Sequence, residues 1–472
     1  MADDDVRDAI RGALRAPPGS WAPVRKLARK ALAPVEHFLS VEAASGVVLL
    51  AAAVIALAWA NSPWRNLYAA LWHASIGLHV GPWSFDRDLH FWINDGLMTV
   101  FFFVVGLEIR REIHRGELSE LRRATLPLAA ALGGMATPAL IFYAFNHGRP
   151  SATGWGVPMA TDIAFAVGVL ALLGKRVAPA LRILLLALAV IDDVGAILVI
   201  AIFYAAGFSA IGVLVAGVGV AAIVILQKVG ARSPFAYVIP AIVIWAGALI
   251  AGIHPTLAGV VVGLMTPVRA WYGKDRFLEV AESNVTALRA EDHVGAHHAQ
   301  AHLDALDEAR REAVSPIDRL QHALHGWVAY GVMPLFALAN AGVALGEAKF
   351  EGDGLRVFLG VMFGLVFGKL TGVLGMSWLA RRLGLTTLPA GVGWKQVAVV
   401  GSCAGIGFTM ALFIAELAFP PGPLLETSRL AILCASAIAG ALAVVMGMKT
   451  LRVEHEEGTA SCESEAEAST KR

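Results

Sequence analysis

Charged residues are scarce in this 472-residue chain: they make up 16% of it, against about 25% in a typical soluble protein. Neither sign dominates, because 38 Lys and Arg stand against 37 Asp and Glu, for a formal net charge of +1. This balance provides no basic field, which argues against nucleic acid as a partner. Only three cysteines are present and none forms a CxxC pattern, so neither a disulfide framework nor a cysteine zinc site is expected.

Apolar sequence is abundant instead. Hydrophobic residues make up 57% of the chain and gather in runs near the length of about 20 residues that a helix needs to cross a bilayer. Twelve such runs lie near 41–60, 91–109, 124–145, 157–173, 181–205, 208–226, 235–251, 255–271, 326–345, 355–379, 396–419 and 428–448. The sequence therefore predicts an all-α polytopic membrane protein with about 12 transmembrane helices.

Lys and Arg are concentrated in the N-terminal tail and in the loops on the same side of the predicted membrane domain. By the positive-inside rule this distribution predicts that both termini are cytoplasmic. The predicted organisation is a tail over 1–40, a membrane domain over 41–449 and a disordered acidic tail over 450–472. A hydrophilic cytoplasmic insertion at about 272–320 is rich in Ala, Glu, Asp, Arg and His and is predicted to be a surface helix.

A few charged residues fall inside the apolar runs, where each costs about 2.5–3.5 kcal/mol on insertion scales. Asp192 and Asp193 lie midway along the fifth run, and Lys369 lies within the tenth. Adjacent residues project in different directions from a helix, so one aspartate can face a cavity while the other faces a partner helix. Lys369 is the natural partner for one of them. Asp95, near the end of the second run, is either an interfacial cap or a transport residue.

Two runs contain helix-breaking residues beside polar ones. In the fourth, two glycines and a proline within 154–158 precede Thr161 and Asp162; in the eleventh, 401–409 holds three glycines and two hydroxyls. Such interruptions in matching positions are typical of the midplane binding site of a secondary transporter. Carboxylates, hydroxyls and freed carbonyls are hard oxygen donors that suit small hard cations. A carboxylate removed from water also binds protons readily, so a cation and a proton can compete for it.

Eight motifs occur in order along the chain: WINDGLM (92–98), VGLEIRRE (105–112), ATDIAFAVGVLALLG (160–174), IDD (191–193), HPTLAGV (254–260), FALANAGV (336–343), GK (368–369) and GIGFTM (405–410). With these motifs the chain resembles the NhaA-type sodium/proton antiporters from about Val41 to Lys449. The resemblance implies inverted-topology repeats with two discontinuous helices. It also implies a transporter of the bacterial inner membrane that is not an enzyme, needs no cofactor and serves pH homeostasis and salt tolerance.

The resemblance assigns roles by position. The family exports cytoplasmic sodium or lithium while a larger number of protons enters, which makes the exchange electrogenic. Asp193 resembles the principal carboxylate for the metal cation and the proton, and Asp192 the residue that pairs with Lys369. Asp162, with Thr161, is expected at the crossing of two broken helices, where Asp162 balances the positive helix ends and Lys369 the negative ones. Asp95 resembles a supporting residue.

The family is also activated at alkaline pH. The candidates for this response are charged or titratable residues expected near the cytoplasmic mouth: Glu108, Arg111, Glu112, His254, His322 and His325. An ordinary basic juxtamembrane face is the alternative interpretation. The chain carries Asp318 and Gln321 where the family pattern has a lysine and a glutamate, so the midpoint of the response is left open.

The segment 77–85, with its Gly-Pro turn, predicts a hairpin on the outer side, and in the family such a hairpin contributes to a homodimer. The expected partners are therefore sodium, lithium, protons, membrane lipid and a second copy of the chain. A proton-coupled carrier of another small solute on the same scaffold is the rival hypothesis. Such a carrier of organic anions would present basic groups to its substrate, whereas aspartates dominate the predicted site.

Overall fold

The computed structural model describes residues 44–81, 83–205, 207–290, 296–346, 348–389 and 391–451. The predicted N-terminal tail over 1–40 lies outside these residues, as does the C-terminal tail beyond Leu451.

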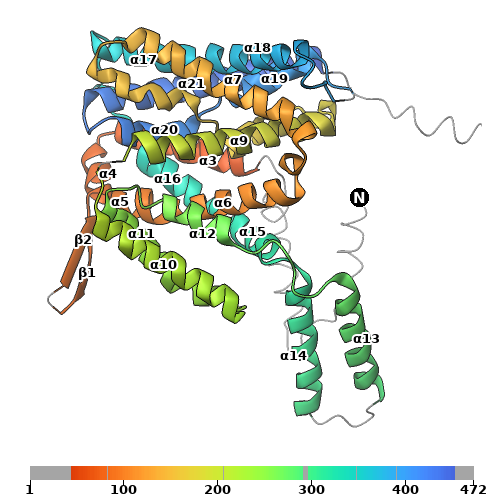
Figure 1. The fold of residues 1–472 in the computed structure, drawn as a ribbon. Helices are drawn as coiled ribbons and strands as arrows, with labels where there is room; N and C mark the ends of the chain where they lie inside the picture. The colour runs from red at the N-terminus through yellow and green to blue at the C-terminus, as the bar shows by residue number, and fades with distance from the viewer. Residues whose placement is uncertain are drawn as a thin grey trace, which may run out of the picture. The chain divides into compact units, whose positions relative to one another are not determined.

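The described chain is mostly helical (Figure 1). From the N-terminal side the elements are α3 (Ala44–Ala60), α4 (Arg65–Trp72), β1 (Ser75–Val80), β2 (Trp83–Asp88), α5 (Leu89–Phe91), η1 (Trp92–Leu97), α6 (Met98–Arg115), η2 (Glu117–Ser119), α7 (Leu121–Asn146), η3 (Pro150–Met159), α8 (Ile163–Ala171), η4 (Gly174–Arg176), α9 (Pro179–Phe203), α10 (Ala210–Val229), η5 (Pro234–Tyr237), α11 (Val238–Ala251) and α12 (Leu257–Met265). They continue with α13 (Lys274–Ala290), α14 (Ala296–Ala313), α15 (Pro316–Trp327), η6 (Val328–Val332), α16 (Met333–Asn340), α17 (Asp353–Phe363), η7 (Gly364–Gly368), α18 (Lys369–Arg382), α19 (Trp394–Ala404), α20 (Phe408–Ala418) and α21 (Pro423–Thr450).

Seven helical runs among the described residues are long and apolar enough to cross a membrane. Three bent helix pairs raise this number to ten if each pair is one span: α3 with α4 (117°), η3 with α8 (44°) and α19 with α20 (48°). The two remaining predicted spans, 255–271 and 326–345, fall on the nine-residue α12 and on the run from α15 to α16. Neither meets the length and composition criteria, so the predicted count of about 12 is not reached by these measures.

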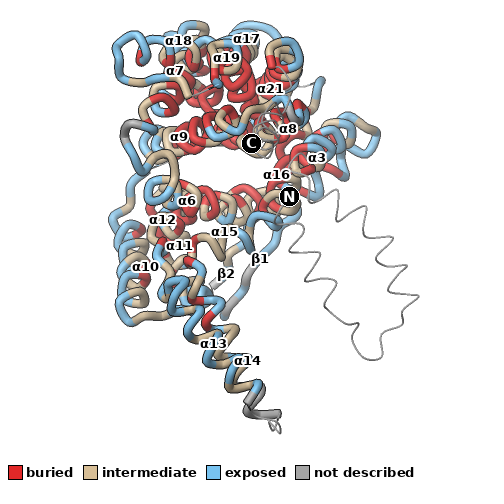
Figure 2. Tube along the Cα trace, turned by 90° about the vertical axis from the view of Figure 1, so that its right-hand side faces the viewer, coloured by how far each residue is buried: buried red, intermediate tan, exposed pale blue. Residues whose placement is uncertain are grey.

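The helices form two groups. The first, here called the core bundle, is built by α7, α9, α17, α18, α19 and α21, which pack on one another (Figure 1). The second, here called the side bundle, is built by α6, α10, α11 and α12. Among these spans, α9 of the core bundle is the most buried, at 67%, and α10 of the side bundle is the least buried, at 17% (Figure 2). The surroundings of α9 are therefore a place where charged side chains can be held away from solvent and lipid.

Helices α7 and α18 approach each other closely in the core bundle. A Cβ added to Gly133 would lie 2.1 Å from the carbonyl oxygen of Gly372, so only glycine allows the two backbones to meet here. Small residues at such crossings are typical of packed membrane helices. The contact brings the start of α18, and with it Lys369, against α7, where Gly134 lies close to the lysine side chain.

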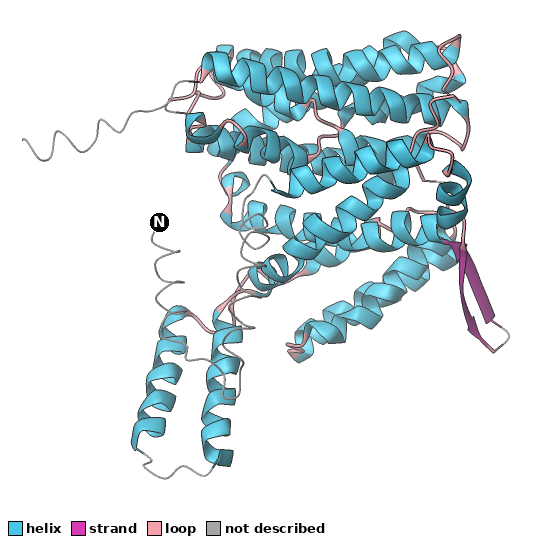
Figure 3. Ribbon diagram, turned by 180° about the vertical axis from the view of Figure 1, so that it is seen from behind, coloured by secondary structure: helices cyan, strands magenta, loops and turns pink. Residues whose placement is uncertain are grey.

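The two ends of the helical unit carry different additions (Figure 3). The predicted hairpin is confirmed as β1 and β2, an antiparallel pair in which Gly77 faces Asp86. We call this the hairpin end. The hydrophilic insertion forms two helices, α13 and α14, which pack against each other. We call that the insertion end. The run from α5 to α6 joins the two, because it starts after β2 and ends at Arg115, which donates to the carbonyl oxygen of Val268.

Candidate functional site

A buried ion pair lies in the core bundle, between α9 and α18. The Lys369 ammonium is 2.5 Å from Oδ2 of Asp192, and both side chains are 0% exposed. Lys369 also donates to the hydroxyl of Thr161 at 2.9 Å. That hydroxyl lies 2.7 Å from Oδ2 of Asp192 and 2.9 Å from the carbonyl oxygen of Ala404. Four segments thus meet at this site: α9 through Asp192, α18 through Lys369, the break before α8 through Thr161, and α19 through the carbonyl of Ala404.

The neighbouring carboxylate, Asp193, is also buried but is not satisfied in this way. Among the described residues no group forms a hydrogen bond with its Oδ1, and the same holds for Oδ1 of Asp192. The carboxylates of Glu108, Asp192 and Asp162 and the opposite charge of Lys369 lie close enough to act on it. An isolated ionised carboxylate is costly to bury, so such a group favours a bound proton or a bound cation. The arrangement therefore suits a carboxylate that exchanges one for the other.

Asp162 caps two helices at once. It is the N-cap of α8, where its Oδ1 accepts from the backbone N–H of Phe165 at 3.0 Å. Its Oδ2 accepts from the backbone N–H of Thr409 at 3.2 Å and from the hydroxyl of the same residue, in the first turn of α20. A negative charge is favourable at a helix N-terminus, and here one carboxylate serves two. The breaks in both bent pairs are therefore held at this residue.

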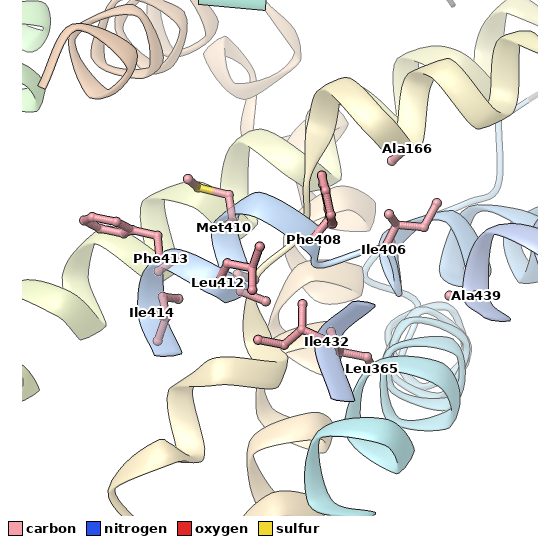
Figure 4. Close-up of a cluster of buried hydrophobic side chains, with 14 of the residues drawn as sticks. Ala166, Leu365, Ile406, Phe408, Met410, Leu412, Phe413, Ile414, Ile432 and Ala439 are labelled. Carbon is pink, nitrogen blue, oxygen red and sulfur yellow. The ribbon is translucent and has the colours of Figure 1, made fainter. Parts of the chain in front are cut away.

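The bent pairs η3–α8 and α19–α20 are also joined through their unwound segments. The backbone N–H of Asp162 donates to the carbonyl oxygen of Ile406 at 2.7 Å. Around the second break, Ile406 and Phe408 pack with Leu365 and Ala166 (Figure 4). A Cβ added to Gly405 would lie 2.5 Å from the carbonyl oxygen of Leu365, so glycine is required at this crossing. The glycines of 401–409 thus allow the chain to unwind inside an apolar core.

Asp95 lies elsewhere, at the hairpin end of the side bundle. It belongs to the π-helical segment η1, and its backbone carbonyl accepts from the Trp245 indole at 2.9 Å and from the Thr99 hydroxyl. It lines a cavity of about 260 Å³ together with His254 and seven other residues, among them Asp88, His90 and Glu416. The central aspartates are not among the residues that line this cavity.

The candidates for a pH response are divided between the two ends. Glu108, Arg111 and Glu112 lie in the last turns of α6, 13 or more residues beyond Asp95, which is about 20 Å along a helix. His254 lines the cavity at the hairpin end instead, so it does not belong to a group with them. His322 and His325 lie on α15, which packs against α6. Among the described residues, no hydrogen bond or ion pair joins these histidines to the three residues of α6.

The two departures from the family pattern have clear positions. Asp318 lies in the first turn of α15 and its carboxylate is 3.3 Å from the Arg115 guanidinium. The hydroxyl of Ser315, the N-cap residue, lies 2.5 Å from the same carboxylate. Oε1 of Gln321 is buried and has no hydrogen-bond partner among the described residues. Asp318 therefore ties α15 to the insertion end of α6.

One charged cluster was not predicted from the sequence. Arg429, on α21, donates to Glu416 of α20 and, at 2.7 Å, to Glu426. The guanidinium side chain is 11% exposed, so this is a second largely buried set of ionised groups. The signal that could have indicated it is Glu416 itself, a carboxylate inside the apolar run 396–419.

In the described part of the chain, no three or more His, Cys, Asp or Glu side chains are placed so that together they could hold a metal ion. In the insertion, His302 is hydrogen bonded to Asn284 at 2.8 Å, which links α14 to α13. His293 lies outside the described residues, as do the side chains of His297 and His298.

The chain is similar to proteins of known family. Residues 36–446 match the model of the family described as Na+/H+ antiporter 1. The chain is 56% identical to a protein of Sorangium cellulosum (strain So ce56) named Na(+)/H(+) antiporter NhaA 2, with 100% of both chains covered. A Myxococcus xanthus (strain DK1622) protein of the same name is 53% identical, with 96% of this chain and 97% of the relative covered.

A more distant relative supports the same grouping. It is the Na(+)/H(+) antiporter NhaA of Bartonella henselae (strain ATCC 49882 / DSM 28221 / CCUG 30454 / Houston 1), which is 43% identical over 90% of this chain and 94% of the relative. These relatives are named as antiporters, which are transporters. With a family match over most of its length and relatives at this level of identity, the chain belongs to the Na+/H+ antiporter 1 family.

Proposed function

We propose that this chain exports cytoplasmic sodium or lithium in exchange for protons, and that the cation and the proton compete for Asp193, with Asp192 as the second carboxylate. The observation that carries the proposal is the fully buried Lys369–Asp192 pair beside a carboxylate with an unsatisfied oxygen. A cation that enters between the two aspartates gives Asp192 a new partner. The lysine then loses its counter-charge, and a buried ammonium without one releases its proton readily.

Electrogenic exchange is part of this proposal. One sodium carries one charge outward, while Asp193 and Lys369 together offer two sites from which protons can be taken. If both protons enter per cycle, net positive charge moves inward and the membrane potential drives sodium out. Lysine suits this role because its ammonium can lose a proton, which a guanidinium does not do in proteins.

We propose that alkaline activation arises at the insertion end of α6, from Glu108, Arg111, Glu112, His322 and His325. Glu108 supports this because its carboxylate lies close enough to Asp193 for the two charges to interact. We infer that His254 acts at the other end, because it lines the cavity with Asp95. The Asp318–Arg115 contact is exposed, so it contributes little by itself to the steepness of the response.

We propose that the membrane domain, 41–449, crosses the inner membrane twelve times in two inverted repeats, with η3–α8 and α19–α20 as the discontinuous spans and both termini in the cytoplasm. In this orientation the insertion end is cytoplasmic and the hairpin end is outside. Exposed apolar side chains on α10, such as Ile211, Leu214 and Ile225, suit contact with lipid. We further propose that β1 and β2 contribute to a homodimer.

A proton-coupled carrier of another small solute remains the second candidate. A solute larger than a metal ion needs a cavity at the buried charges, but Asp192, Asp193 and Lys369 are at most 3% exposed. A small cation that sheds its water fits this closed site better.

The test uses inverted membrane vesicles with an acid interior and a pH-sensitive dye inside. Addition of sodium or lithium across pH 6.5 to 9 is expected to restore the dye signal, whereas potassium and choline are not. Asp193→Asn is expected to abolish the response at unchanged expression, because the amide has nearly the same volume but cannot titrate. Sodium-dependent exchange that persists in Asp193→Asn would refute the assignment.

A further inference from the structure

Helix α20, the second half of the bent pair α19–α20, is enclosed by other parts of the protein over most of its length. Its residues 408–415 are each at most 5% exposed. The helix begins at Phe408, directly after the break at 405–407, and in its first turn Thr409 binds the carboxylate of Asp162. The position of α20 therefore decides where this carboxylate lies.

Helix α21 packs against both halves of this bent pair. Small residues of α21 face the break: a Cβ added to Gly405 would lie 3.2 Å from Cβ of Ala439. A Cβ added to Gly440 would lie 3.7 Å from Cδ1 of Ile406, and Figure 4 shows the break together with Ala439. Small residues allow membrane helices to approach closely. Helix α21 therefore comes near enough to bind the backbone at the break.

This face of α21 also carries a hydroxyl. The backbone N–H of Phe408 donates to Oγ of Ser436 at 3.1 Å, and Ser436 is 3% exposed. The first N–H groups of a helix have no acceptor within the helix itself. At the start of α20 the N–H of Phe408 binds Ser436, and the N–H of Thr409 binds Asp162. The start of α20 is thus held by α21 as well as by Asp162.

The other end of α20 is fixed to the same helix. Glu416, near the end of α20, accepts from the guanidinium of Arg429 on α21. Arg429 also binds Oε1 of Glu426, whose Oε2 accepts from the backbone N–H of Ala344 at 3.3 Å. Arg429 precedes Ser436 by seven residues, which is about two turns of helix. A helix held at two points along its length can neither slide along α21 nor rotate against it.

A short path leads from α20 to the buried ion pair. Thr161 precedes Asp162 in the chain, and its hydroxyl lies 2.7 Å from Oδ2 of Asp192. The same hydroxyl accepts from Lys369 at 2.9 Å. A shift of α20 would move Asp162, and with it the hydroxyl of Thr161. Ion sites depend on such supporting groups, because small displacements of the ligands weaken binding.

We propose that Ser436 and Arg429 are positioning residues for the cation site: through them α21 holds α20, and with it Thr161 and Asp162, in the geometry that the transported alkali cation requires. The inference rests on the proposed function, because it takes the cation and its site from there. Both residues act through α20 and do not touch the ion.

The chain offers a matched control for Ser436. Ser428 lies on the same helix and is fully buried, but no described residue forms a hydrogen bond with its Oγ. Ser428→Ala and Ser436→Ala each remove one buried hydroxyl from α21, but only Ser436→Ala removes a bond to α20. For the other point of attachment, Arg429→Lys keeps a positive charge beside Glu416, whereas Arg429→Ala does not.

The experiment measures initial rates of sodium-dependent and of lithium-dependent proton movement in inverted vesicles, which give KM and kcat for each ion. Loss of a group that supports a metal ligand costs about 10–100-fold in affinity, and Ser436 acts from farther away, so we expect Ser436→Ala to raise the KM for sodium about threefold. We expect a similar rise for Arg429→Ala, and KM values close to wild type for Ser428→Ala and Arg429→Lys.

Lithium separates positioning from stability. It is the smaller ion, so displaced oxygen donors change the KM for lithium and the KM for sodium by unequal factors. Lower stability alone reduces the amount of active protein and leaves both KM values unchanged. We therefore expect the ratio of the two KM values to shift in Ser436→Ala and to stay constant in Ser428→Ala.

Unchanged KM values in Ser436→Ala, or the same rise in Ser428→Ala, would overturn the positioning role. If Arg429→Ala does not accumulate in the membrane, Ser436→Ala, which removes a single oxygen, decides by itself. Exchange that is lost in Asp193→Asn but has wild-type KM values in Ser436→Ala and Arg429→Ala would keep the proposed function and refute this inference. A wild-type chain with no response to sodium or lithium would refute both.

Discussion

The core bundle and the hairpin end each contain a largely buried ion cluster, and the two clusters use different basic residues. In the core bundle Lys369 binds Asp192 beside the unpaired Asp193, and all three are shielded from solvent. At the hairpin end Arg429 binds two glutamates, one of which faces a cavity. An ammonium is a point charge that can give up its proton, whereas a guanidinium stays charged and holds carboxylates in fixed geometry. The difference indicates that the cluster around Lys369 can bind and release protons, whereas the cluster around Arg429 stays ionised and is structural.

Exchanging the basic residues tests this difference between the two clusters most directly. Lys369→Arg keeps the charge but not the ability to release a proton, so we expect the initial rate of sodium-dependent exchange to fall at least tenfold. Arg429→Lys keeps the charge in a cluster that does not need to titrate, and we expect less than a twofold change. Vesicle dye assays on both variants, normalised to expression, give the two rates. A Lys369→Arg protein with near wild-type exchange would show that the lysine proton is not carried.

Removing the basic residue distinguishes the clusters by stability. Lys369→Ala leaves Asp192 buried without its cation and is expected to lower the free energy of unfolding by about 3–5 kcal/mol. Arg429→Ala leaves glutamates that are 14% exposed, one of them at a cavity, so we expect a smaller loss. Thermal unfolding of the detergent-solubilised proteins measures both. The double variant Lys369→Met, Asp192→Leu is the control: recovery of stability without exchange would separate folding from transport.

Helix capping offers a third contrast between the two regions. Asp162→Ala removes the cap of both α8 and α20, so we expect a loss of about 1–4 kcal/mol, at about 0.5–2 kcal/mol for each cap. Asp88→Ala, at the hairpin end, removes a single cap, at the start of the continuous helical run Leu89–Arg115, and we expect a loss of about 1 kcal/mol. Unfolding midpoints in the same detergent test the order. Equal losses would contradict a double capping role for Asp162.

The smallest effect is expected at an exposed ion cluster in the insertion. Hydrogen bonding from Arg310, with the nearby charge of Arg311, lowers the pKa of Asp307 below its usual 3.8. A lowered pKa contributes stability that is present above the unfolded-state pKa and is lost only as the pH falls through the folded-state value. Nothing therefore changes between pH 6.5 and 9, and Asp307→Asn should leave the pH profile of exchange unaltered. A shifted profile would place part of the pH response in the insertion.

Much of the site was predictable because membrane-buried charges are rare. Asp192, Asp193 and Lys369 stand out as charges within apolar runs, and the glycines of 401–409 indicate a broken helix. The all-helical membrane class follows from the same runs. These features are local, so the sequence carries them directly.

Other features depend on packing between distant segments. From the sequence, His254 is expected near the cytoplasmic mouth with Glu108, but the packing of α12 against α6 decides which end it occupies, and it lines the cavity with Asp95. Glu416 and Arg429 were unpredicted as a pair because they lie 13 residues apart across a turn between two helices. The insertion forms two helices rather than one, and these pack against each other and are linked by the hydrogen bond between His302 and Asn284.

The crossing of the two bent pairs has a mechanical consequence. Asp162 is hydrogen bonded to Phe165, Ile406 and Thr409. Thr161 lies within hydrogen-bond distance of the Ala404 carbonyl, so several hydrogen bonds hold the two bent pairs together at the crossing. A displacement that separated α8 from α20 would have to break these bonds together. The contact between the crossing and α9 is easier to break. It depends on the contacts of Thr161 and Lys369 with Asp192, which an arriving cation can replace. During transport we therefore expect the pairs η3–α8 and α19–α20 to move together, as one rigid body, relative to α9.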